Sequence, residues 1–300
     1  MLKRILKMKK ILVAGATGKQ GSATAYELLK NGFEVFALTR NPMSPEAEQL
    51  KQAGAQLVKG DLEDVEVLRD TLSKMDGLYL VLPGVWVSSI ETDEAEAALG
   101  IQTLKLAEEQ GVKFVLYSSV MASDKQDLFR PKFKFTIEKY LLESQLQGTV
   151  IRPASFMENL ILPSFGLGEG KFVNPLPEET AISWVATKDI GTFARIIFQN
   201  HNAFNGKIID FGGEMFTPKQ VLKLLEDKLN QKIEFIQVPV EILYQQSETF
   251  AKLVEMIAKE GYDPIDYELI SSWMPKLTGF DEWLDAEGVD KIKELQAAAN

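Results

Sequence analysis

The sequence predicts an α/β protein built on a doubly wound, mostly parallel sheet, with a smaller and mainly helical C-terminal lobe. Two features of the 300-residue chain predict this fold. Strand-like and helix-like segments alternate through its first half, and the connections between them are short. The strand-like runs are also nearly continuous in Val, Ile, Leu and Phe, as in strands that helices cover on both faces.

The first half of the chain divides readily into predicted elements. The predicted strands are 10–15, 33–40, 55–61, 77–84, 113–119 and 148–153. The predicted helices are 19–31, a helix that begins near Ser44, 62–75, 90–111 and 133–144. Ser44 precedes a proline, which is typical of a helix start because serine caps the first N–H groups and proline fits the first turn.

Glycine and proline become frequent after residue 153. The stretch 154–180 is loop-rich and suits the wall of a substrate cleft. A helix (188–199) and a strand (206–213) follow it, and Thr217 with the next proline starts another helix. A strand at 232–239 and three further helical segments complete the predicted lobe.

Charge and composition exclude several classes of function. The chain holds 33 basic and 43 acidic residues, a net charge of −10, which disfavours nucleic acid as the main ligand. Basic residues cluster only in 1–10, which we interpret as a solubilising extension, with a targeting or membrane-touching arm as the alternative. No apolar segment there is long enough for a secretory signal, and the run from Ile11 is too short for a membrane span.

The absence of cysteine excludes disulfides, thiolate metal sites and cysteine nucleophiles. A reducing compartment is compatible with this composition, so we expect a cytoplasmic protein. The single histidine, His201, lies in a turn-rich segment that we expect to be a surface loop. A histidine triad and a multi-histidine metal site are therefore excluded, and no metal site is predicted.

A glycine-rich turn joins the first predicted strand to the first helix. Such turns need a residue that tolerates positive φ, a place without a side chain where a diphosphate can approach, and a third small residue for packing. The phosphates then lie on the N–H groups at the positive end of the helix. The expected cofactor contacts here come from Gly15, Thr17, Gly18, Lys19, Gln20 and Gly21.

The end of the second predicted strand indicates which nucleotide binds. Sites for NAD place a carboxylate there to bind the ribose hydroxyls, whereas this chain has Thr39 and Arg40. A guanidinium suits a 2′-phosphate in charge and geometry, so we expect NADP (NADPH) rather than NAD. The alternative is an ordinary solvent-exposed arginine.

The third predicted strand ends at Asp61, where the adenine of the nucleotide would lie. Asp61 could accept a hydrogen bond from the adenine amino group, with Leu62 beside it. The same aspartate could instead be the N-cap of the following helix, and both roles can coexist.

The glycine spacing G-x-x-G-x-x-G resembles that of the short-chain dehydrogenase/reductase superfamily. The motifs ILVAGATGKQG, LTRNP, KGDLED, GVKFVLYSS, IEKYLLES and IRPASFMENL, in this order, resemble its atypical NmrA-like branch. The resemblance is specific over about 10–160 and looser over 187–198 and 206–213. It implies an NADP-binding Rossmann domain, and the branch includes redox-sensing NADP binders and NAD(P)H:quinone reductases.

The basic N-terminal cluster and the change of composition after residue 153 divide the chain into a basic extension (1–9), an NAD(P)-binding Rossmann domain (10–153) and a substrate or partner lobe (154–300). Segment 187–213 is expected to return a helix and a strand to the Rossmann sheet. The resemblance also puts Phe156 and Asn159 against the nicotinamide, with Leu82 and Pro83 at the opposite wall.

The catalytic Tyr-x-x-x-Lys of the superfamily is only half present at its expected place. Aligned on IEKY, the cofactor-contacting lysine is Lys134, which is also our catalytic candidate, but the tyrosine position holds Arg130. A guanidinium stays protonated and is a poor general acid. The alternative for Lys134 is a surface pair with Glu138 at i+4.

Ser118 and Ser119 follow the fifth strand, where active reductases use a serine to orient substrate; as backbone-capping hydroxyls they would need no function. Tyr26 and Lys30 also match the Tyr-x-x-x-Lys pattern, but they lie in the first helix and we interpret the match as a coincidence.

Two hypotheses follow from the sequence. The first is an NADPH-dependent oxidoreductase that passes hydride to a quinone-like or other small carbonyl acceptor. The second is a non-catalytic NADP(H) sensor whose C-terminal lobe binds a protein partner. Quinones need little proton assistance, so the missing tyrosine does not exclude the first hypothesis.

Overall fold

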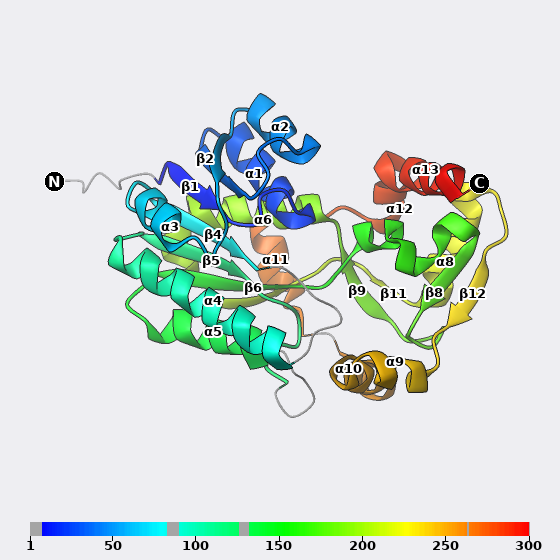
Figure 1. The fold of residues 1–300 in the computed structure, drawn as a ribbon. Helices are drawn as coiled ribbons and strands as arrows, with labels where there is room; N and C mark the ends of the chain where they lie inside the picture. The colour runs from blue at the N-terminus through cyan, green and yellow to red at the C-terminus, as the bar shows by residue number, and fades with distance from the viewer. Residues whose placement is uncertain (1–7, 83–89, 126–131, 263, 300) are drawn as a thin grey trace.

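The computed structural model describes residues 8–82, 90–125, 132–262 and 264–299. Within them, seven parallel strands form one sheet in the order β10-β6-β5-β4-β1-β2-β3 (Figure 1). The strands are β1 Lys10–Val13, β2 Glu34–Thr39, β3 Gln56–Lys59, β4 Gly77–Val81, β5 Phe114–Ser118, β6 Gly148–Pro153 and β10 Ile208–Phe211. The predicted doubly wound α/β fold is confirmed.

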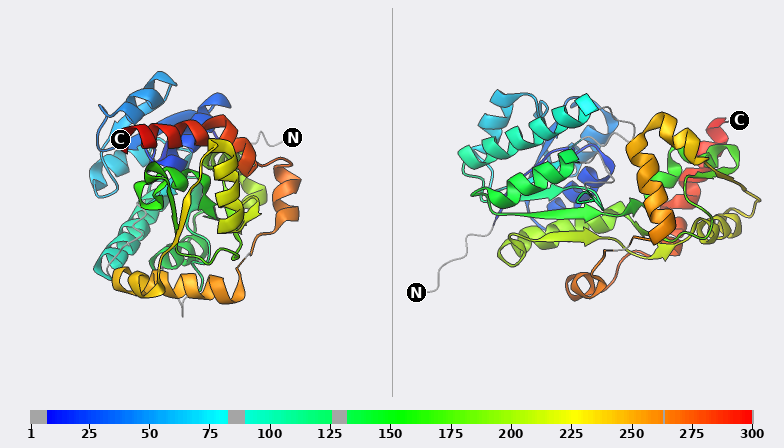
Figure 2. Two further views of the ribbon diagram at one scale, coloured as in Figure 1. Left: turned by 90° about the vertical axis from the view of Figure 1, so that its right-hand side faces the viewer. Right: turned by 90° about the horizontal axis from the view of Figure 1, so that it is seen from below.

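Helices cover both faces of this sheet. They are α1 Lys19–Lys30, α2 Pro45–Gln52, α3 Val65–Leu72, α4 Ile90–Glu109, α5 Lys132–Glu143, α6 Thr187–Gln199, α7 His201–Phe204 and α11 Tyr267–Trp273. One buried cluster joins the sheet to α1 and α6, and a second joins its opposite face to α3, α4 and α5. Figure 2 shows α4 and α5 side by side along that second face.

Segment 187–213 adds helices α6 and α7 and strand β10 to the seven-stranded sheet and the helices that cover it. Helix α6 packs along α1, and β10 pairs with β6 in parallel register, with Ile209 opposite Ile151. His201 begins the short helix α7 instead of lying in a loop, and its ring contacts Phe114 edge-on at 5.7 Å between centroids. The surface-loop interpretation of this histidine was therefore wrong.

The C-terminal lobe contains two small sheets beside its helices. Its strands are β7 Ser155–Phe156, β8 Lys171–Asn174, β9 Ile182–Val185, β11 Met215–Phe216 and β12 Glu234–Gln237. Its helices are η1 Met157–Ile161, η2 Pro163–Phe165, η3 Leu167–Glu169, α8 Pro218–Leu229, α9 Val240–Gln246, α10 Glu248–Glu260, α12 Phe280–Trp283, the π-helical η4 Leu284–Gly288, and α13 Val289–Ala299. Figure 2 shows α13 across one end of the lobe, with α9 and α10 across the other.

The stretch 154–180, predicted to be loop-rich, contains β7, η1, η2, η3 and β8. Strand β8 was missed because its hydrogen-bond partner, β12, lies far along the chain. The helix starts were predicted better, since a cap is local. Ser44 accepts a hydrogen bond from Ala47 N at 3.2 Å, and Thr217 forms a reciprocal capping box with Gln220.

A membrane-crossing segment is not found in the described part of the chain, because none of its helices combines sufficient length with sufficient apolar character. The expected cytoplasmic location stays a prediction.

Helix α6 approaches α1 so closely that their backbones touch at Gly191. A Cβ built on this glycine would lie 2.5 Å from the carbonyl oxygen of Ala23 and 2.9 Å from the amide nitrogen of Thr24. The obstacle is backbone and not the end of a flexible side chain, so the two helices would have to separate. Gly191 therefore sets the distance between α1 and α6.

We predict that Gly191→Ala lowers the free energy of unfolding by about 1 to 3 kcal/mol, as overpacking typically does. Alanine gains about 1 kcal/mol of helix propensity, so a stabilised variant would show that the contact is loose. Urea denaturation measures the change. Thr192→Ala is the matched control, because Thr192 is the next residue of α6 and its hydroxyl bonds only the Lys188 carbonyl among the described residues.

Candidate functional site

The predicted glycine turn connects β1 to α1 at the carboxyl edge of the sheet. Gly15 has a φ of +70°, a conformation that side chains strain, and its carbonyl accepts a hydrogen bond from Gly18 N at 3.0 Å. A Cβ on Gly21 would lie 2.0 Å from that same carbonyl oxygen. Glycine at these positions lets the first turn of α1 lie directly against the end of β1.

The N-terminus of α1 is suited to an anion. Its N-cap is Gly18, which has no side chain to accept from the first-turn N–H groups, and that first turn has no acidic residue. Helices α2, α3 and α8 are capped by their own serine, aspartate or threonine side chains. The positive end of α1 therefore has no competing carboxylate or hydroxyl from its own cap, which fits a diphosphate. Thr17 and Gly18 belong to the same exposed turn.

Lys19 is directed at the C-terminal lobe. Its ammonium donates to the Glu158 carbonyl oxygen at 2.8 Å and to Asn159 Oδ1 at 3.3 Å. Burial lowers the pKa of Lys19, while the charge of Glu158 opposes this shift. The structure thus brings two predicted site residues, Lys19 of α1 and Asn159 of η1, into direct contact, and the Lys19 ammonium is bound to η1.

Gln20 reaches under the turn to the ends of β4 and β5. Its Oε1 accepts from Ser118 Oγ at 2.7 Å and from Tyr79 Oη at 3.2 Å. Tyr79 is completely buried, and this burial raises its pKa to about 12. Ser118, which the sequence suggested as a substrate-orienting residue, donates its hydroxyl proton to Gln20.

The expected ribose-phosphate end lies at the ends of β2 and β3. Thr39 is buried, and its Oγ1 accepts from Asn41 N at 3.2 Å, while Arg40 is exposed immediately after the strand. Gly60 N donates to the Thr39 carbonyl at 3.1 Å, which holds the loop after β3 beside Arg40. The guanidinium is thus accessible at the edge where a 2′-phosphate is expected.

Asp61 does not cap the third helix. Its Oδ1 accepts from Glu63 N at 2.9 Å and from Asp64 N at 3.2 Å, which closes a turn before the helix. The N-cap of α3 is Asp64, whose carboxylate accepts from Val67 N. The alternative interpretation of Asp61 as helix cap was therefore wrong, and Leu62 beside it is buried in the core.

The residues expected on the two sides of the nicotinamide, Phe156 and Asn159 on one and Leu82 and Pro83 on the other, differ in how deeply they are buried. Phe156 is half-buried against the core cluster that contains α1 and α6, and Asn159 in η1 is 9% exposed. Leu82, just after β4, is buried. Pro83 and Arg130 lie outside the described residues.

Lys134 forms an ion pair with a residue that the sequence did not suggest. Its ammonium lies 2.7 Å from Glu96 Oε1, and the two side chains are only 12% and 10% exposed. The alternative pairing with Glu138 was wrong, because Glu138 is fully buried and bound elsewhere. Helix α4 therefore supplies the counter-ion that orients the candidate lysine of α5.

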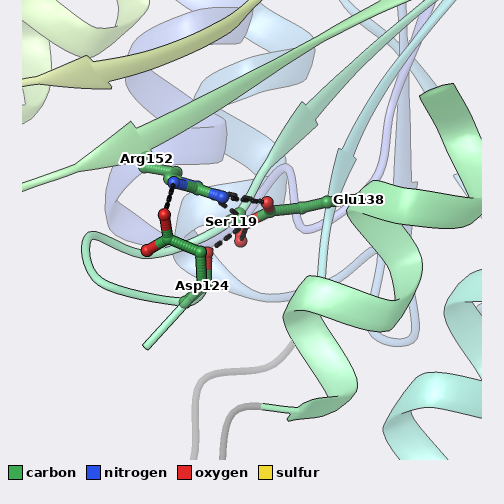
Figure 3. Close-up of polar contacts among 5 residues, drawn as sticks. Ser119, Asp124, Glu138 and Arg152 are labelled. Atoms are coloured by element: carbon green, nitrogen blue, oxygen red, sulfur yellow. Dashed lines mark hydrogen bonds and ion pairs between the residues drawn. The ribbon is translucent and has the colours of Figure 1, made fainter. Parts of the chain in front are cut away.

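A buried carboxylate–guanidinium pair lies near the carboxyl ends of β5 and β6 (Figure 3). Glu138 of α5 accepts from Arg152 Nη2 at 2.6 Å and Nε at 3.1 Å, and also from the hydroxyls of Ser119 and Ser123. Asp124 lies 3.2 Å from Arg152 Nη1. Burial opposes the charge of Arg152, but Glu138 and Asp124 outweigh it and raise the pKa of the guanidinium.

Sequence reasoning missed this cluster, although a signal existed. An arginine near the end of an apolar strand and a glutamate beside Ile137 on the buried face of a helix each imply a charged partner. Only the fold shows that Arg152 and Glu138 pair with each other. It also shows that Ser119, the second serine considered in the sequence, donates to Glu138.

Glu158 is another buried carboxylate that was not predicted. Its Oε1 accepts from Thr187 N at 2.9 Å and from Thr187 Oγ1 at 2.8 Å. Burial raises the pKa of Glu158, and the hydrogen bonds from Thr187 only partly offset this effect. Its Oε2 is buried without a hydrogen-bond partner among the described residues.

Comparison with known proteins gives this site a family context. A model of the NmrA-like family matches residues 7–284, so the chain belongs to the NmrA-like family. An NmrA-like family domain-containing protein of Dictyostelium discoideum is 26% identical over 299 residues, which cover 92% of this chain and 97% of that protein.

Two solved structures share the fold. NmrA, a negative transcriptional regulator in complex with NADP, has a TM-score of 0.75 at 19% identity and covers 96% of this chain and 98% of its own. An NADPH-dependent quinone oxidoreductase of Escherichia coli in complex with NADPH has a TM-score of 0.73 at 21% identity, with coverages of 93% and 99%.

We predict that Glu138→Gln lowers the free energy of unfolding by roughly 3 kcal/mol, because it leaves Arg152 buried with less opposite charge. The double variant Glu138→Gln, Arg152→Met should cost less than the sum of the two single changes, since it removes the orphaned charge. Denaturant unfolding of the three variants measures this coupling. Glu143→Gln, on the exposed face of α5, is the control and should change the free energy of unfolding by less than about 0.5 kcal/mol. If the effects of the two single changes simply add in the double variant, Glu138 and Arg152 are not energetically coupled and the prediction is wrong.

Proposed function

We propose that this protein binds NADP(H) at the carboxyl edge of its sheet and passes hydride to a quinone-like or other small carbonyl acceptor. The observation that carries this proposal is the uncapped N-terminus of α1 behind a turn that needs glycine, with Arg40 exposed at the end of the neighbouring strand. The first would hold the diphosphate and the second the 2′-phosphate. Similarity to NADP-bound and NADPH-bound structures supports the same cofactor.

Other residues predicted from the sequence would contact the rest of such a cofactor. Asp61 would accept from the adenine amino group beside Leu62, and Lys134 would bind the nicotinamide ribose. Phe156, Asn159 and Leu82 would enclose the nicotinamide. When bound, the nicotinamide supplies the hydride; the chain's own residues orient it and exclude water from one face.

The hydrogen-bond directions at the site favour an acceptor that needs little proton assistance. Ser118 donates to Gln20 and Ser119 donates to Glu138, so neither hydroxyl proton points at a substrate. The superfamily tyrosine is replaced by Arg130, which is a poor acid. A quinone that receives hydride becomes a hydroquinone anion, which water can protonate, and the quinone oxidoreductase of similar fold supports this acceptor class.

The alternative function is a non-catalytic NADP(H) sensor whose C-terminal lobe (154–300) binds a protein partner. The directions of the Ser118 and Ser119 hydroxyls, which both donate to protein side chains, favour this alternative as well, because a sensor needs no proton donor. The similarity to NADP-bound NmrA, a transcriptional regulator, supports it as well. Both functions would use the same nucleotide site and differ in whether hydride passes from the bound NADPH to an acceptor.

We predict that Arg40→Ala weakens NADPH binding by roughly 10- to 100-fold, which corresponds to about 1.5 to 3 kcal/mol for a charge-assisted contact. Affinity for NADH should change by less than about twofold, since NADH has no 2′-phosphate. Isothermal titration calorimetry with both nucleotides measures the ratio. Lys51→Ala, an exposed lysine on α2, is the charge-matched control; an unchanged NADPH affinity in the Arg40 variant would refute the assignment.

We predict NADPH oxidation with a quinone acceptor at a rate above about 1 s⁻¹, the low end of typical enzymes. Absorbance of NADPH is followed with a panel of benzoquinones, naphthoquinones and aldehydes. Lys134→Met should lower kcat/KM about tenfold if Lys134 orients the nicotinamide ribose. Tight NADPH binding with no oxidation across the panel would contradict the oxidoreductase hypothesis and favour the sensor hypothesis.

A further inference from the structure

The segment that would face the nicotinamide, Phe156 with η1, comes from the lobe and not from the Rossmann sheet. It must therefore be held at a set distance from the phosphate turn by contacts that cross between the two. One such contact is already clear: Lys19, the first residue of α1, donates to the backbone carbonyl of Glu158 and to the Asn159 side chain. A single lysine on a flexible stem is a loose tie, because its four-carbon chain has many rotamers.

The Glu158 side chain makes a second tie in the opposite direction. Its Oε1 accepts from both the amide and the hydroxyl of Thr187, the first residue of α6. Two donors from one residue fix the carboxylate in position and direction. The contact is fully enclosed, since Glu158 is 5% and Thr187 7% exposed.

Helix α6 passes this constraint on to the phosphate turn. It lies against α1 with Gly191 in backbone contact with Ala23, and α1 begins at the turn. Glu158 is thus connected to the turn by two rigid helices, while Lys19 connects the turn to η1 directly. Segment η1 is therefore connected to the phosphate turn in two ways: through Lys19, and through Thr187, α6 and α1.

The cost of burying Glu158 indicates that its side chain has a role. Oε2 is buried with no hydrogen-bond partner in the described part of the chain, and burial raises the pKa of the group. A threonine hydroxyl and amide could be satisfied by an uncharged acceptor at lower cost. Charges of the C-terminal helices also act on the two ties: Glu287 of η4 raises the pKa of Glu158, and Lys291 of α13 lowers the pKa of Lys19.

We propose that Glu158 is a positioning residue that sets the distance between the nicotinamide-facing segment and the phosphate turn, by tying η1 to the N-terminus of α6. This inference rests on the proposed NADP(H) function. It assigns Glu158 no contact with the cofactor. Its effect is therefore confined to the nicotinamide half of the nucleotide, and the adenosine half at Arg40 and Asp61 is independent of it.

The test compares NADPH with 2′,5′-ADP, which carries the adenosine and 2′-phosphate but no nicotinamide. Isothermal titration calorimetry gives both affinities for the full-length protein and for Glu158→Ala, Glu158→Gln and Thr187→Val. Glu158→Ala should weaken NADPH binding about tenfold or more, as the loss of two hydrogen bonds allows, and change 2′,5′-ADP binding by less than about twofold. Glu158→Gln keeps an acceptor for Thr187 and should restore most of the NADPH affinity.

Thr187→Val removes only the hydroxyl tie and should give a smaller, equally selective loss, which also decides the matter if Glu158→Ala does not fold. Equal loss of both ligands in either variant would show a purely structural role and overturn the proposal, as would unchanged NADPH affinity in a folded Glu158→Ala protein. Failure of the unsubstituted protein to bind either ligand would instead refute the nucleotide function itself, and the positioning role with it.

Discussion

Backbone contact at two glycines is the constraint on which the arrangement of this protein depends. Gly21 presses the first turn of α1 against the Gly15 carbonyl, and Gly191 presses α6 against the Ala23 carbonyl. Helix α1 is therefore enclosed on two sides by main chain, which does not yield as side chains do. The glycine turn before α1 and segment 187–213, which contains α6, take their relative positions from these two contacts.

The charges beside this scaffold are buried where they join elements. Glu138 binds Arg152 between α5 and β6, Lys134 binds Glu96 between α5 and α4, and Glu158 binds Thr187 between η1 and α6. Each burial costs desolvation energy, so these contacts are weak evidence for stability as such. Their geometry is specific, however: Glu138 binds Arg152 through two nitrogens, and Glu158 accepts from both the amide and the hydroxyl of Thr187, so each contact fixes the orientation of the two elements that it joins.

The sequence predicted what local rules decide. The glycine turn, the Ser44 and Thr217 caps and the parallel strands follow from neighbouring residues, and the motif order predicted the family. The partners of Lys19, Lys134 and Glu138 could not be predicted, because they lie 139, 38 and 14 residues away. Asp61 and Asp64 show that a local prediction can fail as well. The sequence allows either aspartate to cap α3, and in the structure Asp64 is the N-cap.

The direction of the hydrogen bonds links the two candidate functions. Among the described residues of the candidate site, the hydroxyls of Ser118 and Ser119 and the ammonium of Lys19 all donate to protein acceptors, so none of these three groups is directed at a substrate. Lys19 and Glu158 also sense the charges of Lys291 and Glu287 in the C-terminal helices. A ligand anion at the α1 N-terminus would therefore act electrostatically on the same lysine that ties the turn to the lobe. An oxidoreductase would use this tie to position the nicotinamide, and a sensor would use it to transmit nucleotide occupancy to the surface of the lobe.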